Sequence, residues 1–237
     1  DRVFWGGYEV RLTRVDQDGF VVTGWENILI SPEGTNSDKH YYEDAVVTED
    51  AIFVSWRDAD NHIYAKHIPF NSTDPDDPNG DAILTIDNEG QKYSESVSMD
   101  YNSESNEVLS CWQEAPISAY NIHCSSINLD DLTISGGVVI FENSSYTQTN
   151  PSIIATDHAT YLVTWEDERI GNYSDLYIQE ITTTTWEQTE SYDDGGTVLC
   201  NAGLNQFNSQ LQKIQDQDIY LSYWEDDRSS GKASVTN

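Results

Sequence analysis

A tryptophan recurs at nearly even intervals along this chain, and this period constrains the fold more than any other feature of the sequence. The spacings between the five successive residues are 51, 56, 53 and 59: Trp5, Trp56, Trp112, Trp165 and Trp224. An acidic residue stands two positions after each of the last four, and Gly7 stands there after the first: Asp58, Glu114, Asp167 and Asp226. A period of this length indicates a repeat architecture in which each period is one supersecondary unit.

Each period contains four short runs of β-branched and aromatic residues, bounded by turn residues. In one period these runs are 152–156, 160–164, 175–181 and 197–200. Such runs predict strands, and no ten-residue window carries a convincing helical stripe. Four short antiparallel strands in about 50 residues are typical of a β-propeller blade.

We therefore expect an all-β chain, a β-propeller of four-stranded antiparallel blades with about 4.5 repeats across residues 1–237. The spacing predicts three complete blades and a partial blade at each end: 40–86, 91–141 and 148–200, with 1–31 and 205–237 partial. Such a chain is either an arc of a larger propeller or a closed four-bladed ring. The overlapping ends favour the arc, with further repeats or domains on the same polypeptide.

The best copy of the repeat reads Trp165-Glu-Asp-Glu-Arg169 and then Asp175-Leu-Tyr-Ile-Gln-Glu-Ile181, and Trp224-Glu-Asp-Asp-Arg228 is nearly as good. This pattern resembles the propeller repeats of large secreted and cell-surface proteins of bacteria and archaea. The segment 191–198 is distantly similar to the Asp-box of sialidase-type propellers, with Val198 where that motif has Trp. The resemblance implies a propeller fold and a secreted or cell-surface location, but no particular activity, because one fold hosts many.

The charge of the chain narrows the range of partners. Eleven Lys and Arg residues stand against 42 Asp and Glu residues, which gives a formal net charge of -31. Nucleic acid and anionic membranes carry the same sign and should be repelled. No apolar run of about 18 residues exists, so we expect no membrane insertion. An acidic surface attracts cations instead.

The densest acidic loop, 74–81, is the candidate calcium site. Hard oxygen ligands in a tight, glycine-containing turn suit Ca²⁺. The candidate ligands are Asp74, Asp76, Asp77, Asn79 and Asp81. Their spacing does not match an EF-hand loop, and a solvated loop without metal is the alternative.

The periodic residues are expected to serve the fold. We expect the five Trp rings to fill the wedge between neighbouring blades and the acids to accept backbone N–H bonds at turns. A ring of cation ligands is the alternative for the acids. Arg169 and Arg228 should brace the same turns as surface ion pairs. Trp25 and Trp186 lie outside the period and are better candidates for exposed aromatics than the five periodic tryptophans.

Three cysteines occur in the chain. Cys111 and Cys124 lie in adjacent predicted strands of one blade and could face each other across a hairpin. Either a disulfide or two unbridged, partly buried thiols is consistent with that placement. A disulfide would favour an extracellular location, since such bonds persist outside the cytosol. Cys200 has no evident partner and should be a free thiol.

The sequence contains no motif for nucleophilic, phosphate or histidine-metal chemistry, and we name no catalytic residue. The function expected is that of a non-catalytic extracellular module that mediates protein or glycan binding and adhesion within a larger secreted or surface protein. Two alternatives stay open. One is a carbohydrate-active enzyme, a glycoside hydrolase or polysaccharide lyase, and the other is a structural subunit of a surface layer or filament.

Overall fold

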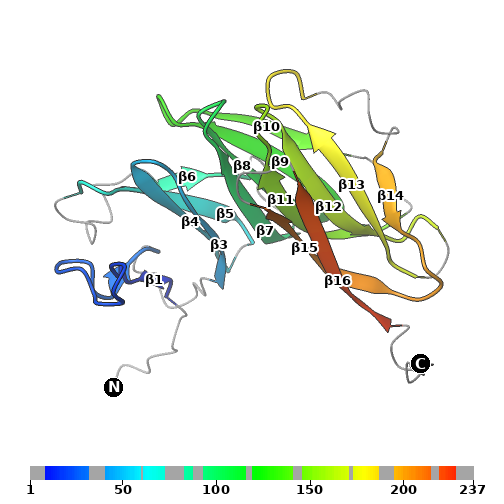
Figure 1. The fold of residues 1–237 in the computed structure, drawn as a ribbon, viewed down its shortest axis with the longest axis horizontal. Helices are drawn as coiled ribbons and strands as arrows, with labels where there is room; N and C mark the ends of the chain where they lie inside the picture. The colour runs from blue at the N-terminus through cyan, green and yellow to red at the C-terminus, as the bar shows by residue number, and fades with distance from the viewer. Residues whose placement is uncertain are drawn as a thin grey trace. The chain divides into compact units, whose positions relative to one another are not determined.

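The computed structural model describes residues 9–31, 41–59, 61–72, 83–87, 93–115, 119–140, 146–170, 173–186, 195–214 and 219–227. Within these ranges the chain is all-β, with no α-helix (Figure 1). It divides into two compact units, unit 1 at Asp1–Glu95 and unit 2 at Ser96–Asn237. The described residues include no helix that is long and apolar enough to cross a membrane.

Sixteen strands make up the described fold. They are β1 Arg11–Leu12, β2 Ile28–Leu29, β3 Tyr41–Val47, β4 Ala51–Arg57, β5 Ile63–Pro69, β6 Ile83–Thr85, β7 Tyr93–Asn102, β8 Glu107–Ala115, β9 Asn121–Asn128, β10 Ile134–Val139, β11 Gln148–Ala155, β12 Tyr161–Asp167, β13 Asp175–Ile181, β14 Thr197–Cys200, β15 Gln206–Lys213 and β16 Tyr220–Asp226.

The strands pair in chain order within each sheet. Three sheets have four strands, β3–β6, β7–β10 and β11–β14, and two have two strands, β1–β2 and β15–β16. The pairings that can be followed residue by residue are antiparallel. The predicted all-β fold with four-stranded antiparallel sheets is therefore confirmed.

The core of unit 1 lies between β1–β2 and the sheet β3–β6. Trp25 and Ile28 belong to one buried cluster with Val54, Trp56 and Ile68. The guanidinium of Arg14 lies over the Trp25 ring, 5.3 Å from its centroid. The prediction that Trp25 is exposed was wrong, because its ring is only 6% exposed and fills the space between the two sheets.

The core of unit 2 lies between the sheets β7–β10 and β11–β14. One buried cluster joins residues of both sheets: Leu109, Cys111, Ile122, Cys124, Ile153, Tyr161, Val163, Trp165, Tyr177 and Ile181. Trp186 packs against this cluster and is half-buried, so it is not the exposed aromatic that its position out of phase predicts. Strand β11 contacts both β8 and β15, and Figure 1 shows β15 beside β11.

The second and third strands of each complete sheet pair in the same register. Trp56 lies opposite Tyr64 and Trp165 opposite Tyr177. In the sheet between them Trp112 lies opposite His123. Each indole stacks on its cross-strand ring, with centroids 5.8–6.0 Å apart and ring planes within 24°. The three tryptophans are 0–1% exposed.

The first strand of successive sheets also carries a shared irregularity. The pairing of β11 shifts between Thr149 and Ser152, and that of β15 shifts between Phe207 and Gln210. Inside each shift an asparagine adopts a left-handed backbone, Asn150 with φ 52° and Asn208 with φ 55°. Asparagine tolerates this conformation better than most residues. The bulge turns one backbone N–H of each strand away from its own sheet.

Candidate functional site

Asp167, the acid two positions after Trp165, accepts hydrogen bonds on both carboxylate oxygens from donors of its own sheet and turn. Asp167 Oδ2 accepts a hydrogen bond from Trp165 Nε1 at 3.1 Å and another from Gln148 Nε2 at 3.0 Å. Its Oδ1 accepts the backbone N–H of Arg169 at 2.8 Å, and the guanidinium of Arg169 pairs with Oδ2. With four donors on one carboxylate, Asp167 is a structural acceptor that fixes the corner of the sheet.

Arg169 closes this corner from the solvent side. Its Cζ lies 3.9 Å from the centroid of the Tyr177 ring, which in turn stacks on Trp165. The Arg169 side chain is 16% exposed and the Asp167 carboxylate is fully buried. The expectation of a surface ion pair was therefore wrong for this corner, because the aromatic stack beneath the pair shields it from water.

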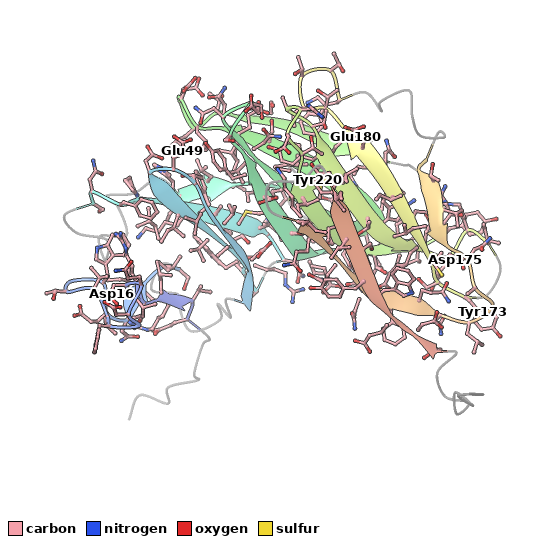
Figure 2. All side chains as sticks on the ribbon, in the orientation of Figure 1. Asp16, Glu49, Tyr173, Asp175, Glu180 and Tyr220 are labelled. Atoms are coloured by element: carbon pink, nitrogen blue, oxygen red, sulfur yellow. A yellow bond between two sulfur atoms is a disulfide. The ribbon has the colours of Figure 1, made fainter. Side chains whose placement is uncertain are left out.

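A second carboxyl faces the same corner. Asp175 begins β13 and pairs directly with Asp167 at the end of β12. It is 4% exposed. Burial raises its pKa, and the negative charge of Asp167 raises it further. In Figure 2 Tyr173 and Asp175 lie at one end of β13, and Glu180 lies at the other.

The other sheets build the corner with different groups. Trp112 Nε1 donates to Glu114 Oε2 at 3.1 Å, and His123 Nε2 lies 3.7 Å from the other oxygen of that carboxyl. In unit 1 Asp58 Oδ1 accepts the backbone N–H of His62 at 2.8 Å. Two of the periodic acids, Asp58 and Asp167, thus accept a backbone N–H as expected, and Glu114 and Asp167 accept an indole N–H.

The Trp165 ring explains why a glycine stands in one turn of the sequence. Gly196, just before β14, has φ +86°, and a Cβ there would overlap Cη2 of Trp165. Gly136 in β10 is similar, because a Cβ there would lie 2.7 Å from the Trp186 ring. Glycine is therefore required at both positions by the close approach of an indole ring.

A repeated polar contact joins successive sheets of unit 2, and it involves the residue directly after each tryptophan. Gln113 Oε1 accepts the backbone N–H of Asn150 at 2.9 Å. Glu166 Oε1 accepts the backbone N–H of Asn208 at 2.8 Å. The N–H that each bulge turns out of its own sheet is thus bound by the preceding sheet.

Glu166 is the most heavily used of these residues. Its Oε1 also accepts a hydrogen bond from Asn150 Nδ2 at 2.8 Å, and its Oε2 accepts one from Thr149 Oγ1 at 3.4 Å. Burial raises the pKa of Glu166, and these donors oppose that shift only in part. The side chain thus links its own sheet to the next one and is 7% exposed.

Side chains of one first strand bind further N–H groups of the next first strand. Ser98 Oγ accepts the backbone N–H of Ile153 at 3.2 Å, and Ser152 Oγ accepts that of Leu211 at the same distance. Asp100 Oδ2 accepts the backbone N–H of Ala155 at 2.7 Å. The sheets of unit 2 are therefore joined by polar contacts in register as well as by the apolar core.

Cys111 and Cys124 face each other across β8 and β9 and form a disulfide, with their Cα atoms 4.1 Å apart. Both residues are fully buried in the core between the two four-stranded sheets of unit 2. Cys200, in β14, is a free thiol of intermediate exposure.

The last strand and the residue before it carry exposed apolar residues in alternation. Leu221 is 49% exposed and Tyr223 is 56% exposed, and Ile219, directly before β16, is 46% exposed. Trp224 is half-buried. The Trp-Glu-Asp sequence is therefore present in β16 without the burial that it has in β12.

Several predicted site residues lie outside the described residues. These are Trp5, Arg228 and the whole candidate calcium loop with Asp74, Asp76, Asp77, Asn79 and Asp81. Asp226 ends β16. Among the residues that the structure describes, no three His, Cys, Asp or Glu side chains gather into a group that could hold a metal ion.

Sequence reasoning missed the residue after each tryptophan, because its chemistry changes from sheet to sheet: Arg57, Gln113, Glu166 and Glu225. The asparagine that it binds was a usable signal. Asn150 and Asn208 stand 15 and 16 positions before Trp165 and Trp224, and asparagine tolerates a left-handed backbone better than most residues.

No protein-family model matches the chain. A search among curated proteins likewise finds no match.

Proposed function

We propose that this chain is part of a non-catalytic, extracellular β-propeller module that presents its loops to a protein or glycan partner. The observation that carries the proposal is the repeated corner, in which the polar groups next to the periodic tryptophan are used for structure. Asp167 is occupied by four donors, and Glu166 binds groups of two successive sheets. Binding is left to the loops, as in other folds with a rigid scaffold.

The propeller arrangement is supported by the packing within unit 2. Strand β11 contacts β8 of the preceding sheet, β7–β10, and β15 of the following pair, β15–β16. The same polar contact is used at both steps, from Gln113 to Asn150 and from Glu166 to Asn208. Repetition of one contact from sheet to sheet is what a radial array of blades requires.

An extracellular location is supported by the disulfide and the charge. A buried Cys111–Cys124 bond suits an oxidising compartment, and a net charge of -31 keeps a protein soluble by self-repulsion. Mass spectrometry of the alkylated, unreduced protein tests this part. We expect one labelled cysteine, Cys200, and three labelled cysteines would contradict the bond.

Glycan binding without turnover is the direct test of the function. The chain would be screened on an array of immobilised glycans and, in parallel, incubated with the same glycans in solution. We expect binding with no new reducing ends and no unsaturated products. Release of either product would establish the alternative, a glycoside hydrolase or a polysaccharide lyase.

Calcium binding belongs to the proposal as a property of the loop 74–81. A ligand that binds only the folded state stabilises it by mass action. Millimolar Ca²⁺ should raise the Tm more than Mg²⁺ at equal ionic strength. Equal increases in Tm with the two ions would show that charge screening, and not specific Ca²⁺ binding, causes the stabilisation.

A further inference from the structure

One face of the last strand pair is apolar and exposed. We call it the terminal face and define it by Ile219, Leu221, Tyr223 and Glu225. These residues alternate along one strand and so project from the same side of it. The three apolar members are 46–56% exposed. Apolar residues gathered on one surface mark an interaction site more often than scattered ones do.

The corresponding positions in the preceding sheets are buried. Leu162, Thr164 and Glu166 hold the places of Leu221, Tyr223 and Glu225, and they are 8%, 0% and 7% exposed. Positions in β12 and β16 are matched by the number of residues that separate them from Trp165 and Trp224 in the sequence. The β12 residues are covered because β15 of the next strand pair packs beside β12.

The polar member of the face is already held in the orientation that receives a neighbour. Glu225 Oε1 accepts a hydrogen bond from Asn208 Nδ2 at 2.9 Å, and Glu166 Oε1 accepts the equivalent bond from Asn150 Nδ2 at 2.8 Å. Glu166 Oε1 then accepts the backbone N–H of Asn208 in the following sheet. Glu225 therefore presents the same acceptor atom, Oε1, with which Glu166 binds the strand pair that follows its own sheet.

We propose that the terminal face receives a further sheet of the same repeat. The first strand of that sheet lies over β16, and the backbone N–H of its left-handed residue donates to Glu225 Oε1. The occupant follows from continuity, since the two preceding sheet contacts of unit 2 use the same acceptor position. A second copy of this chain is disfavoured, because two chains of net charge -31 repel each other. The inference rests on the propeller reading of the proposed function.

The test extends the chain by one of its own repeats. Residues 1–228 are followed directly by residues 170–237, so that the 59-residue spacing between Trp165 and Trp224 is repeated once. A Tyr223→Phe change in the added copy distinguishes the two otherwise identical peptides by mass. Hydroxyl-radical footprinting then reports the exposure of Tyr223 in the original and in the extended chain. We expect its modification to fall several-fold on extension.

Two variants in the original copy locate the contact. Leu221→Asp should leave the Tm of the unextended chain nearly unchanged, because the side chain is exposed, and should restore the modification of Tyr223 in the extended chain. Glu225→Ala should weaken the protection in the same way. Val47→Asp is the matched control, since Val47 is an exposed strand residue of unit 1 and should act equally in both chains.

Equal modification of Tyr223 in both chains, with the strand signal in circular dichroism increased by the added repeat, overturns the proposal. An added repeat that gains no strand signal also overturns it, because the face then fails to fold its occupant. Protection of Tyr223 in a dimer of the unextended chain, detected by light scattering, would assign the face to a second copy instead. None of these measurements depends on glycans, so failure here leaves the proposed binding function standing.

Discussion

The sheet β11–β14 and the pair β15–β16 carry nearly the same sequence around their tryptophans, yet they differ in burial. Trp165 is 0% exposed and stacks on Tyr177 of the third strand. Trp224 is half-buried, and Tyr223 beside it is 56% exposed. Because the local sequence is shared, we attribute the burial of Trp165 to Tyr177 of the third strand, on which it stacks, and to β15, which packs beside β12. The Trp-Glu-Asp sequence specifies a strand, and the strands that pack against it supply the stabilisation.

Removing the two tryptophans should separate these contributions most strongly. Trp165→Ala empties a site in the core between two sheets and should cost about 3–5 kcal/mol. Trp224→Ala removes a ring that is only half-buried and should cost less than about half as much. Urea unfolding followed by circular dichroism measures both. Equal losses would show that the motif, and not its surroundings, sets the energy.

The disulfide provides the next largest effect. The chain itself suggests the replacement, because Thr164 and Ile178 pair in β12–β13 where Cys111 and Cys124 pair in β8–β9. The double variant Cys111→Thr, Cys124→Ile should lose about 2–3 kcal/mol through the freed unfolded chain. The control Cys200→Ser should change stability little. An unchanged unfolding midpoint in the double variant would contradict a stabilising bond.

Glu166 and Glu225 test the contact between sheets. Glu166→Ala leaves the part-buried N–H of Asn208 without its acceptor and should cost about 1–3 kcal/mol. Glu225→Ala in the unextended chain should change stability by less than about 0.5 kcal/mol, since the residue lies at the surface. Chemical denaturation of both variants checks the difference. Similar losses of stability in the two variants would show that this residue acts within its own sheet and not in the contact between sheets.

The pH dependence of Glu166→Gln sharpens the same test. Glutamine keeps the Oε1 acceptor, and Gln113 makes the equivalent bond naturally. Burial raises the pKa of Glu166 in the folded protein above its ordinary value of 4.5. Its stabilising contribution is therefore complete below that value and is lost as the pH rises through the folded-state pKa. Relative to wild type, the Gln variant should become more stable between about pH 4 and pH 7. A stability difference that is independent of pH over this range would rule out the shift.

The smallest expected effect is a gain. Asp175 faces Asp167 across β12 and β13, whereas the equivalent position opposite Glu114 is Asn121. Asp175→Asn removes a like-charge pair and should stabilise the protein by about 0.2–1 kcal/mol at pH 7. The raised pKa of Asp175 makes this gain disappear at low pH, where the wild-type carboxyl is protonated. Thermal unfolding at the two pH values measures it, and destabilisation at pH 7 would reveal a hidden role for the charge.

Strands and their order could be predicted because the information is local. The runs around Trp56, Trp112 and Trp165 are short, rich in β-branched and aromatic residues and bounded by turn residues, and the four-stranded sheets follow from them. The burial of Trp25 could not be read in this way, because it depends on a partner sheet far along the chain. The hydrogen bond between Glu166 and Asn208 could not be predicted either. It joins residues 42 positions apart, and its donor is a backbone N–H, which does not depend on the residue type.

The position of the disulfide makes it a reporter of motion. Cys111 and Cys124 are 0% exposed and belong with Trp165 to the buried cluster between two sheets of unit 2. Thiol–disulfide exchange requires an incoming thiolate to reach one of the two sulfurs in line. In the closed state that path is filled by side chains, so reduction must wait for the sheets to part. The rate at which a small thiol reduces this bond under native conditions therefore measures how often unit 2 opens.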